Sequence, residues 1–133
     1  MRRLTMPEED GPGLRWVTGS KEIRSIRRAG ILQRGSLVFV WTSESVPNEA
    51  DHAAVALVTR RGFKGAVARN LAKRRLRGSV LDKRDLLEPG KRYLIEGRPG
   101  LEKVYYQILV NEISDLLLRS VTCVKKGREP GGE

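Results

Sequence analysis

The sequence predicts a small single domain of the α+β class. Its 133 residues are enough for one domain. Runs rich in β-branched and aromatic residues alternate with segments of helical periodicity, and Gly or Pro turns separate them. The expected order is helix, strand, a short strand or bend, strand, basic helix, strand and helix. This order favours one sheet with helices packed on one side.

The N-terminal part is predicted to contain a tail and a short helix. Residues 1–13 are rich in charged residues, Pro and Gly and lack the apolar region of a signal peptide, so we expect a disordered tail. Ser20 is the expected N-cap of the helix, and Gly30 ends it. Ile23 and Ile26 share its apolar face.

The first clear strand is Ser36–Thr42. β-branched and aromatic residues dominate it, and no turn former interrupts it. Leu37, Phe39 and Trp41 share one face, which favours a core position for Trp41 over a role as a stacking platform. Residues 43–50 include Pro and Asn and are expected to form a loop.

Two further strands flank a basic helix. His52–Thr59 is an apolar run whose small side chains allow a helix to pack closely, and Lys91–Glu96 is the third clear strand. If the two are parallel neighbours, a right-handed crossover is the default. Leu101–Leu118 has the longest apolar stripe at helical spacing. Residues 122–133 are expected to form a second disordered tail, which leaves residues 14–121 as the domain.

Positive charge is concentrated in Arg60–Arg77. This segment holds eight of the 26 Lys and Arg residues, and no Asp or Glu occurs between Asp51 and Asp82. The rest of the chain is nearly balanced, with 18 basic and 16 acidic residues. A dense patch of one sign indicates a polyanionic partner, and a pI near 10.4 points to nucleic acid or an anionic membrane.

The same segment predicts a turn followed by an amphipathic helix. Gly62 and Gly65 frame a GFKG turn in which the backbone can approach a ligand closely, and the helix N-terminus after it is a ready phosphate site. The polar face of the helix carries Arg69, Asn70, Lys73, Arg74 and Arg77. The apolar face carries Val67, Ala68, Leu71, Ala72 and Leu76. Arg75 falls among the apolar residues and is expected to snorkel or to have a partner. We expect the helix to fray by Gly78, and the alternative is that Val80 and Leu81 continue it.

A solvated surface helix is the simplest alternative interpretation of this segment. Exposed helices of that kind usually intersperse Glu with Lys and gain i,i+4 pairs. Here no acid accompanies the cations, which therefore repel each other unless phosphates relieve the repulsion. The pattern favours nucleic-acid binding.

Residues for independent catalysis are scarce. His52 is the only histidine and opens an apolar run, and Cys123 is the only cysteine, which excludes an internal disulfide and a thiolate metal cluster. The sequence has no P-loop, no H-x-x-x-H and no G-x-S-x-G. No apolar run approaches the ~18 residues that span a bilayer. These features favour a cytoplasmic binding protein without a membrane partner.

One stretch of the basic helix resembles a known family. Residues 69–77 read RNLAKRRLR, and their pattern RNxxKRRLR resembles the signature of the bacterial ribonuclease P protein subunit. The flanks are similar too, with a short helix ending in Gly, an aromatic-bearing strand before the basic helix, and a strand and a helix after it. The resemblance covers roughly Gly19–Leu118.

The resemblance implies both a fold and a function. The fold would be like the second domain of ribosomal protein S5, a mixed sheet packed by helices with a left-handed βαβ crossover. The protein would not cut RNA itself. It would assist the catalytic RNA of ribonuclease P, a ribonucleoprotein endonuclease, in removing the 5′ leader of precursor tRNA. Mg²⁺ would be held by the RNA and not by a dedicated protein site.

The resemblance also implies site residues. Those expected to contact RNA are Arg60, Arg61, Lys64, Arg69, Asn70, Lys73, Arg74 and Arg77. Those expected to line a cleft for the single-stranded leader are Ile23, Arg27, Phe39 and Trp41. The family usually has Phe where Ile23 stands, a basic residue where Leu71 stands and Glu where Gly78 stands. Phe39 or Trp41 would then have to supply the stacking ring.

Other classes fit parts of the sequence. GFKG has the GxxG form of the loop in KH domains, although KH loops join two helices and a strand-like run precedes this one. A ribosomal or DNA-binding structural protein would share the charge pattern. A membrane-surface helix is disfavoured because the apolar face is mostly Ala. An independent nuclease is disfavoured because metal ligands are missing.

Overall fold

The domain is built on a five-stranded mixed sheet. A computed structural model describes residues 14–44 and 52–128, with side chains as far as residue 120. The strands are β1 (Leu14–Trp16), β2 (Ile31–Arg34), β3 (Val38–Glu44), β4 (Ala53–Thr59) and β5 (Lys91–Gly97). Their order across the sheet is β1-β4-β5-β3-β2, with β1, β4 and β5 parallel and β3 and β2 antiparallel to their neighbours. The α+β class and the single domain are confirmed.

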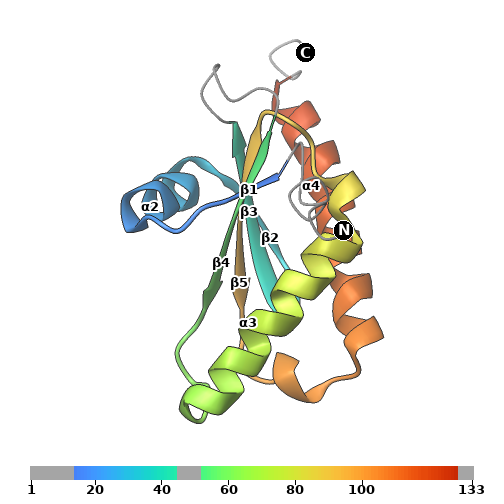
Figure 1. Cartoon of the computed structure of the whole chain (residues 1–133). Coiled ribbons are helices and arrows are strands. Elements are labelled where there is room, and N and C mark those ends of the chain that lie inside the picture. The colour runs from blue at the N-terminus through green and yellow to red at the C-terminus, as the bar shows by residue number, and fades with distance from the viewer. Residues whose placement is uncertain (1–13, 45–51, 129–133) are drawn as a thin grey trace, which may run out of the picture.

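Helices cover both faces of this sheet. Helix α2 (Ser20–Ala29) lies on one face, whereas α3 (Gly65–Asp82) and α4 (Tyr106–Arg128) lie on the other (Figure 1). The expectation of helices on one side only is therefore wrong. The reason lies in β4, where Val55 faces the α3 and α4 core while Ala54 and Ala56 lie against Ile26 of α2. A strand with two apolar faces needs a cover on each.

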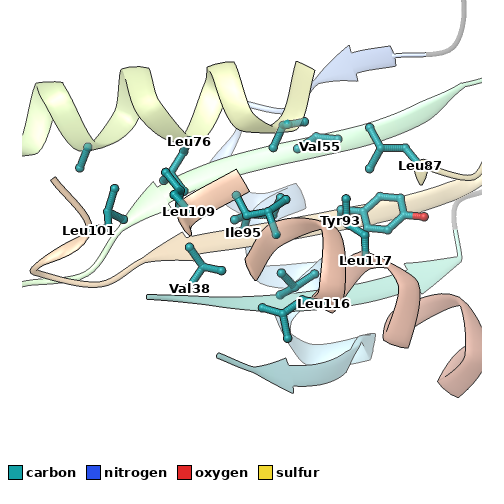
Figure 2. Close-up of a cluster of buried hydrophobic side chains, with 14 of the residues drawn as sticks. Val38, Val55, Leu76, Leu87, Tyr93, Ile95, Leu101, Leu109, Leu116 and Leu117 are labelled. Atoms are coloured by element: carbon teal, nitrogen blue, oxygen red, sulfur yellow. The ribbon is translucent and has the colours of Figure 1, made fainter. Parts of the chain in front are cut away.

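The larger core lies between the sheet and the α3–α4 pair. Figure 2 shows Val38, Val55 and Ile95 of the sheet clustered with Leu76 of α3 and with Leu109, Leu116 and Leu117 of α4. All of these aliphatic side chains are fully buried. Fully burying one such side chain contributes about 1.5–3 kcal/mol, so this cluster fixes the position of α3 on the sheet.

Glu112 of α4 holds the turn between β2 and β3. Its Oε2 accepts hydrogen bonds from the backbone N–H groups of Leu37 at 2.7 Å and Val38 at 3.0 Å, and Oε1 accepts one from Ser36 Oγ at 3.0 Å. A charged acceptor strengthens such bonds, so this one carboxylate joins the β2–β3 hairpin to α4.

Helix α3 continues past the point where fraying was expected. Gly78 does not end it, because Leu76 and Val80 on either side are fully buried. A Cβ at position 78 would lie 2.8 Å from Tyr106 Oη, so glycine allows α4 to approach α3 here. Tyr106 Oη donates a hydrogen bond to Asp82 Oδ2 at 3.0 Å, and burial together with this bond raises the pKa of Tyr106 to about 12.

Several other element boundaries differ from the prediction. The segment expected to begin the last helix forms the 3₁₀ turn η3 (Leu101–Lys103), and a second 3₁₀ turn, η2 (Arg84–Leu86), follows α3. Helix α4 extends to Arg128, so the expected tail boundary at residue 122 lies inside it; no glycine or proline precedes Gly127 to stop the helix.

Some expected segments fall wholly or partly outside the described residues. Of the loop expected at residues 43–50, Ser43 and Glu44 belong to β3 and residues 45–50 are not described. The tail at residues 1–13 also lies outside the description. Strands β4 and β5 are parallel neighbours joined through α3. The left-handed sense of that crossover stays a prediction of the resemblance.

Candidate nucleic-acid interface

The basic face of α3 is exposed as the helical periodicity predicts. Arg69, Asn70, Lys73, Arg74 and Arg77 all face solvent, while Ala72 and Leu76 are buried beneath them. Val67 departs from its expected apolar face with 83% exposure, because it stands in the first turn and the core contacts of the helix begin at Ala68. The cations are therefore presented together on one rigid surface.

Arg75 has the partner that its position required. Its Nη1 donates hydrogen bonds to the carbonyl oxygens of Leu101 at 3.2 Å and Val104 at 2.5 Å. The guanidinium thus satisfies backbone acceptors around η3 and leaves the outer face to the other cations. Within the described residues, no carboxylate forms an ion pair with Arg69, Lys73, Arg74 or Arg77.

The turn before α3 places more cations beside this face. Gly62 and Gly65 adopt φ of 114° and 93°, which other residues rarely tolerate, and the side chain of Phe63 is buried in the core. Arg61 and Lys64 remain exposed. Because the turn joins β4 to α3, the KH interpretation, which needs a loop between two helices, is wrong.

A cleft separates β1 from α3. It has a volume of about 300 Å³ and is lined by Trp16, Thr18 and Leu57 on one side and by Lys73, Arg74 and Arg77 on the other. The Arg77 guanidinium lies 4.6 Å from the centroid of the Trp16 ring, within cation–π distance. Sequence reasoning missed Trp16, and the only signal was an aromatic residue shortly before the first helix.

The four predicted cleft residues gather on the opposite face of the sheet. Phe39 and Trp41 of β3 meet edge to face with centroids 6.2 Å apart, and Arg27 of α2 lies 5.0 Å from the Trp41 ring. Ile23 and Trp41 pack against the same small core cluster. Trp41 is half-buried, so it supports α2 and also presents ring surface. We call the surface formed by Ile23, Arg27, Phe39 and Trp41, together with Glu96 of β5, the α2-side surface.

Glu96 was missed by sequence reasoning. Its side chain is 11% exposed in β5, beside Phe39 of β3, and its carboxylate lies 3.6 Å from Arg27 and 3.8 Å from Arg60. Arg60 is thus drawn towards the α2-side surface and away from the face of α3. Arg34 and Arg98 stand over the Phe39 ring at 5.9 and 4.3 Å. The available signal was an acid at the end of an apolar strand.

Two further properties concern metals and membranes. Among the side chains of residues 14–44 and 52–120, no three His, Cys, Asp or Glu come together as a candidate metal site. Within residues 14–44 and 52–128, no helix has the length and apolar character needed to cross a bilayer.

Comparisons with known proteins agree with the fold and the motif. The family model described as Ribonuclease P matches residues 15–121. The ribonuclease P protein component of Enterococcus faecalis is 30% identical over 116 residues, covering 85% of this chain and 95% of the relative. That of Acholeplasma laidlawii is 31% identical over 83 residues, covering 62% of this chain and 72% of the relative.

Solved structures give the same fold. The RNase P protein of Staphylococcus aureus superposes with a TM-score of 0.65 at 16% identity, covering 77% of this chain and 91% of that one. The RNase P protein of Thermotoga maritima gives 0.64 at 18% identity, covering 74% and 91%. With the family model spanning nearly the whole domain, this chain belongs to the ribonuclease P protein component family.

Proposed function

We propose that this chain is the protein component of a ribonuclease P holoenzyme that removes the 5′ leader of precursor tRNA. In this role the exposed face of α3 binds the catalytic RNA and the α2-side surface binds the single-stranded leader. The observation that carries the proposal is the acid-free row Arg69, Lys73, Arg74 and Arg77 on a helix held rigidly by a buried core. Such a row neutralises phosphates that follow the same line.

The placement of the two surfaces supports their separate roles. The α3 face and the α2-side surface belong to opposite faces of one sheet (Figure 1), so two RNA segments can lie on the protein at once. The α2-side surface offers the Phe39 and Trp41 rings with arginines beside them, which suits unpaired bases and their backbone.

The chemistry of cleavage is assigned to the RNA. Hydrolysis of a phosphodiester by metal-ion catalysis needs Mg²⁺ on the reacting phosphate, and we propose that the RNA holds this ion. The protein adds positive charge where RNA strands meet, which lowers the concentration of Mg²⁺ needed to bring them together. The protein alone is proposed to be non-catalytic and to act in the cytoplasm with its RNA.

A reconstitution assay tests this function. Precursor tRNA is incubated with the catalytic RNA alone, the protein alone and both together, at high and low Mg²⁺. We expect the protein to restore cleavage at low Mg²⁺ and to do nothing without the RNA. Shortening the leader should reduce the stimulation, because the α2-side surface then loses its ligand. Cleavage by the RNA-free protein, or no stimulation at any Mg²⁺ concentration, would refute the proposal.

A further inference from the structure

The cleft between β1 and α3 combines features that phosphate binding alone does not require. One wall carries the half-buried indole of Trp16 with Leu57, and the other carries Lys73, Arg74 and Arg77. The volume of about 300 Å³ lies at the small end of ligand sites, which suits one flat ring better than a folded segment. Neutralising phosphates requires only the three cations and gives no role to the apolar wall of Trp16 and Leu57.

The contact between Arg77 and Trp16 prepares this cleft for a planar group. The guanidinium carbon lies 4.6 Å from the ring centroid, so a cation and an aromatic ring lie in contact at the edge of the cleft. Nucleobases stack on both kinds of surface. Lys73 and Arg74 stand on the same wall with no carboxylate paired to them in the described part of the chain, so phosphates on either side of a base would meet positive charge.

We propose that this cleft binds an unpaired nucleobase of the RNA that lies along α3. The base contacts Trp16 and Arg77, and its neighbouring phosphates pair with Lys73 and Arg74. This inference rests on the proposed function of α3 and adds a base-recognition element to it. The site is distinct from the α2-side surface, because Trp16 packs against the larger core and Trp41 against the smaller cluster on the opposite face.

A single-tryptophan reporter tests the contact directly. Trp16 and Trp41 are the two tryptophans of the chain, so Trp41→Phe leaves Trp16 as the only indole. Titration with an RNA that contains unpaired segments should quench or shift its fluorescence, whereas a perfectly paired duplex of equal length should not. The catalytic RNA alone and precursor tRNA alone are separate arms that identify which molecule supplies the base. No change with any RNA, or an equal change with polyglutamate, would overturn the proposal.

An affinity measurement tests the nucleobase proposal separately from the proposed ribonuclease P function on which it rests. Trp16→Leu keeps an apolar side chain against the core but removes the stacking surface, and Trp16→Phe keeps both. We expect Trp16→Leu to weaken binding of RNA with unpaired segments about tenfold at an unchanged salt dependence, and Trp16→Phe to bind nearly as the parent does. Circular dichroism confirms that each variant is folded.

The two possible failures give different results. If only the nucleobase proposal fails, RNA binding by the parent protein depends steeply on salt, and Trp16→Leu binds the RNA as tightly as the parent protein. If the proposed function fails, the parent protein itself shows no salt-dependent binding of the catalytic RNA.

Discussion

The two RNA-facing surfaces proposed for this protein treat their arginines differently. On α3, Arg69, Lys73 and Arg74 have no acidic partner among the described residues. On the α2-side surface, Glu96 holds Arg27 and Arg60, and aromatic rings lie beneath other guanidinium groups. The cations of the first surface are therefore all available to a ligand. Several arginines of the second surface already interact with Glu96 or with aromatic rings of the protein itself. We therefore expect ionic strength to act mainly on the first.

The largest expected effect comes from the α3 face. Replacing Arg69, Lys73 and Arg77 together by Gln should weaken binding of the catalytic RNA by roughly 10- to 100-fold at low salt and reduce the slope of log Kd against log salt by about 2 to 3 units. Fluorescence anisotropy at several salt concentrations measures both quantities.

A matched control removes the same charge elsewhere. Lys21, Arg84 and Arg119 are exposed on α2, η2 and α4, outside α3 and the turn before it. Their joint replacement by Gln should leave the slope nearly unchanged. Equal slopes for both triple variants would mean that only net charge matters and that the α3 face is not the site.

A smaller effect is expected at Glu96. Glu96→Gln keeps the shape of the side chain but releases Arg27 and Arg60 from their common carboxylate. Both arginines then become available to phosphates of the leader. The leader's contribution to the slope of log Kd against log salt should therefore increase by about one unit for each released arginine that contacts a phosphate. The measurement compares precursor tRNA with mature tRNA. An unchanged difference between them would show that Glu96 does not hold charge back from the ligand.

The smallest expected effect concerns Tyr93 in the larger core, between the sheet and the α3–α4 pair. Burial raises the pKa of Tyr93 to about 12, despite the hydrogen bond that Tyr93 Oη accepts from the Glu88 N–H. The raised pKa favours the protonated phenol in the folded state, so this stabilisation is complete below pH 10 and is lost between pH 10 and 12. Urea unfolding at pH 8 and pH 11 should show the parent losing about 1 kcal/mol more than Tyr93→Phe. Identical losses would contradict the assignment.

Patterns local in the chain were enough to predict most of the fold and the basic face. Helical periodicity placed Arg69, Lys73 and Arg77 correctly, and the family motif led to Ile23, Arg27, Phe39 and Trp41, which do gather on one surface. Their roles in RNA binding stay predictions.

What the sequence left out depends on contacts between distant segments. Strand β1 has only three residues and forms because β4 offers it a parallel edge, so Leu14–Trp16 has no periodicity of its own to detect. Glu96 joins Arg27 and Arg60, which are 69 and 36 positions away in the chain. The cover on both faces of the sheet likewise depends on where α2 docks, and no local pattern specifies that.

The strand order also has a consequence for synthesis of the chain. The central strand β5 lies between β4 and β3, yet it is translated after both. The backbone N–H of Leu37 in the β2–β3 turn can find its acceptor, Glu112 of α4, only after α4 has been translated. Contacts of such long sequence separation slow folding, because the chain loses loop-closure entropy before the contacts form and stabilise it. The domain therefore completes its sheet only when most of the polypeptide has left the ribosome, and until then β3 and β4 each wait with an unpaired edge.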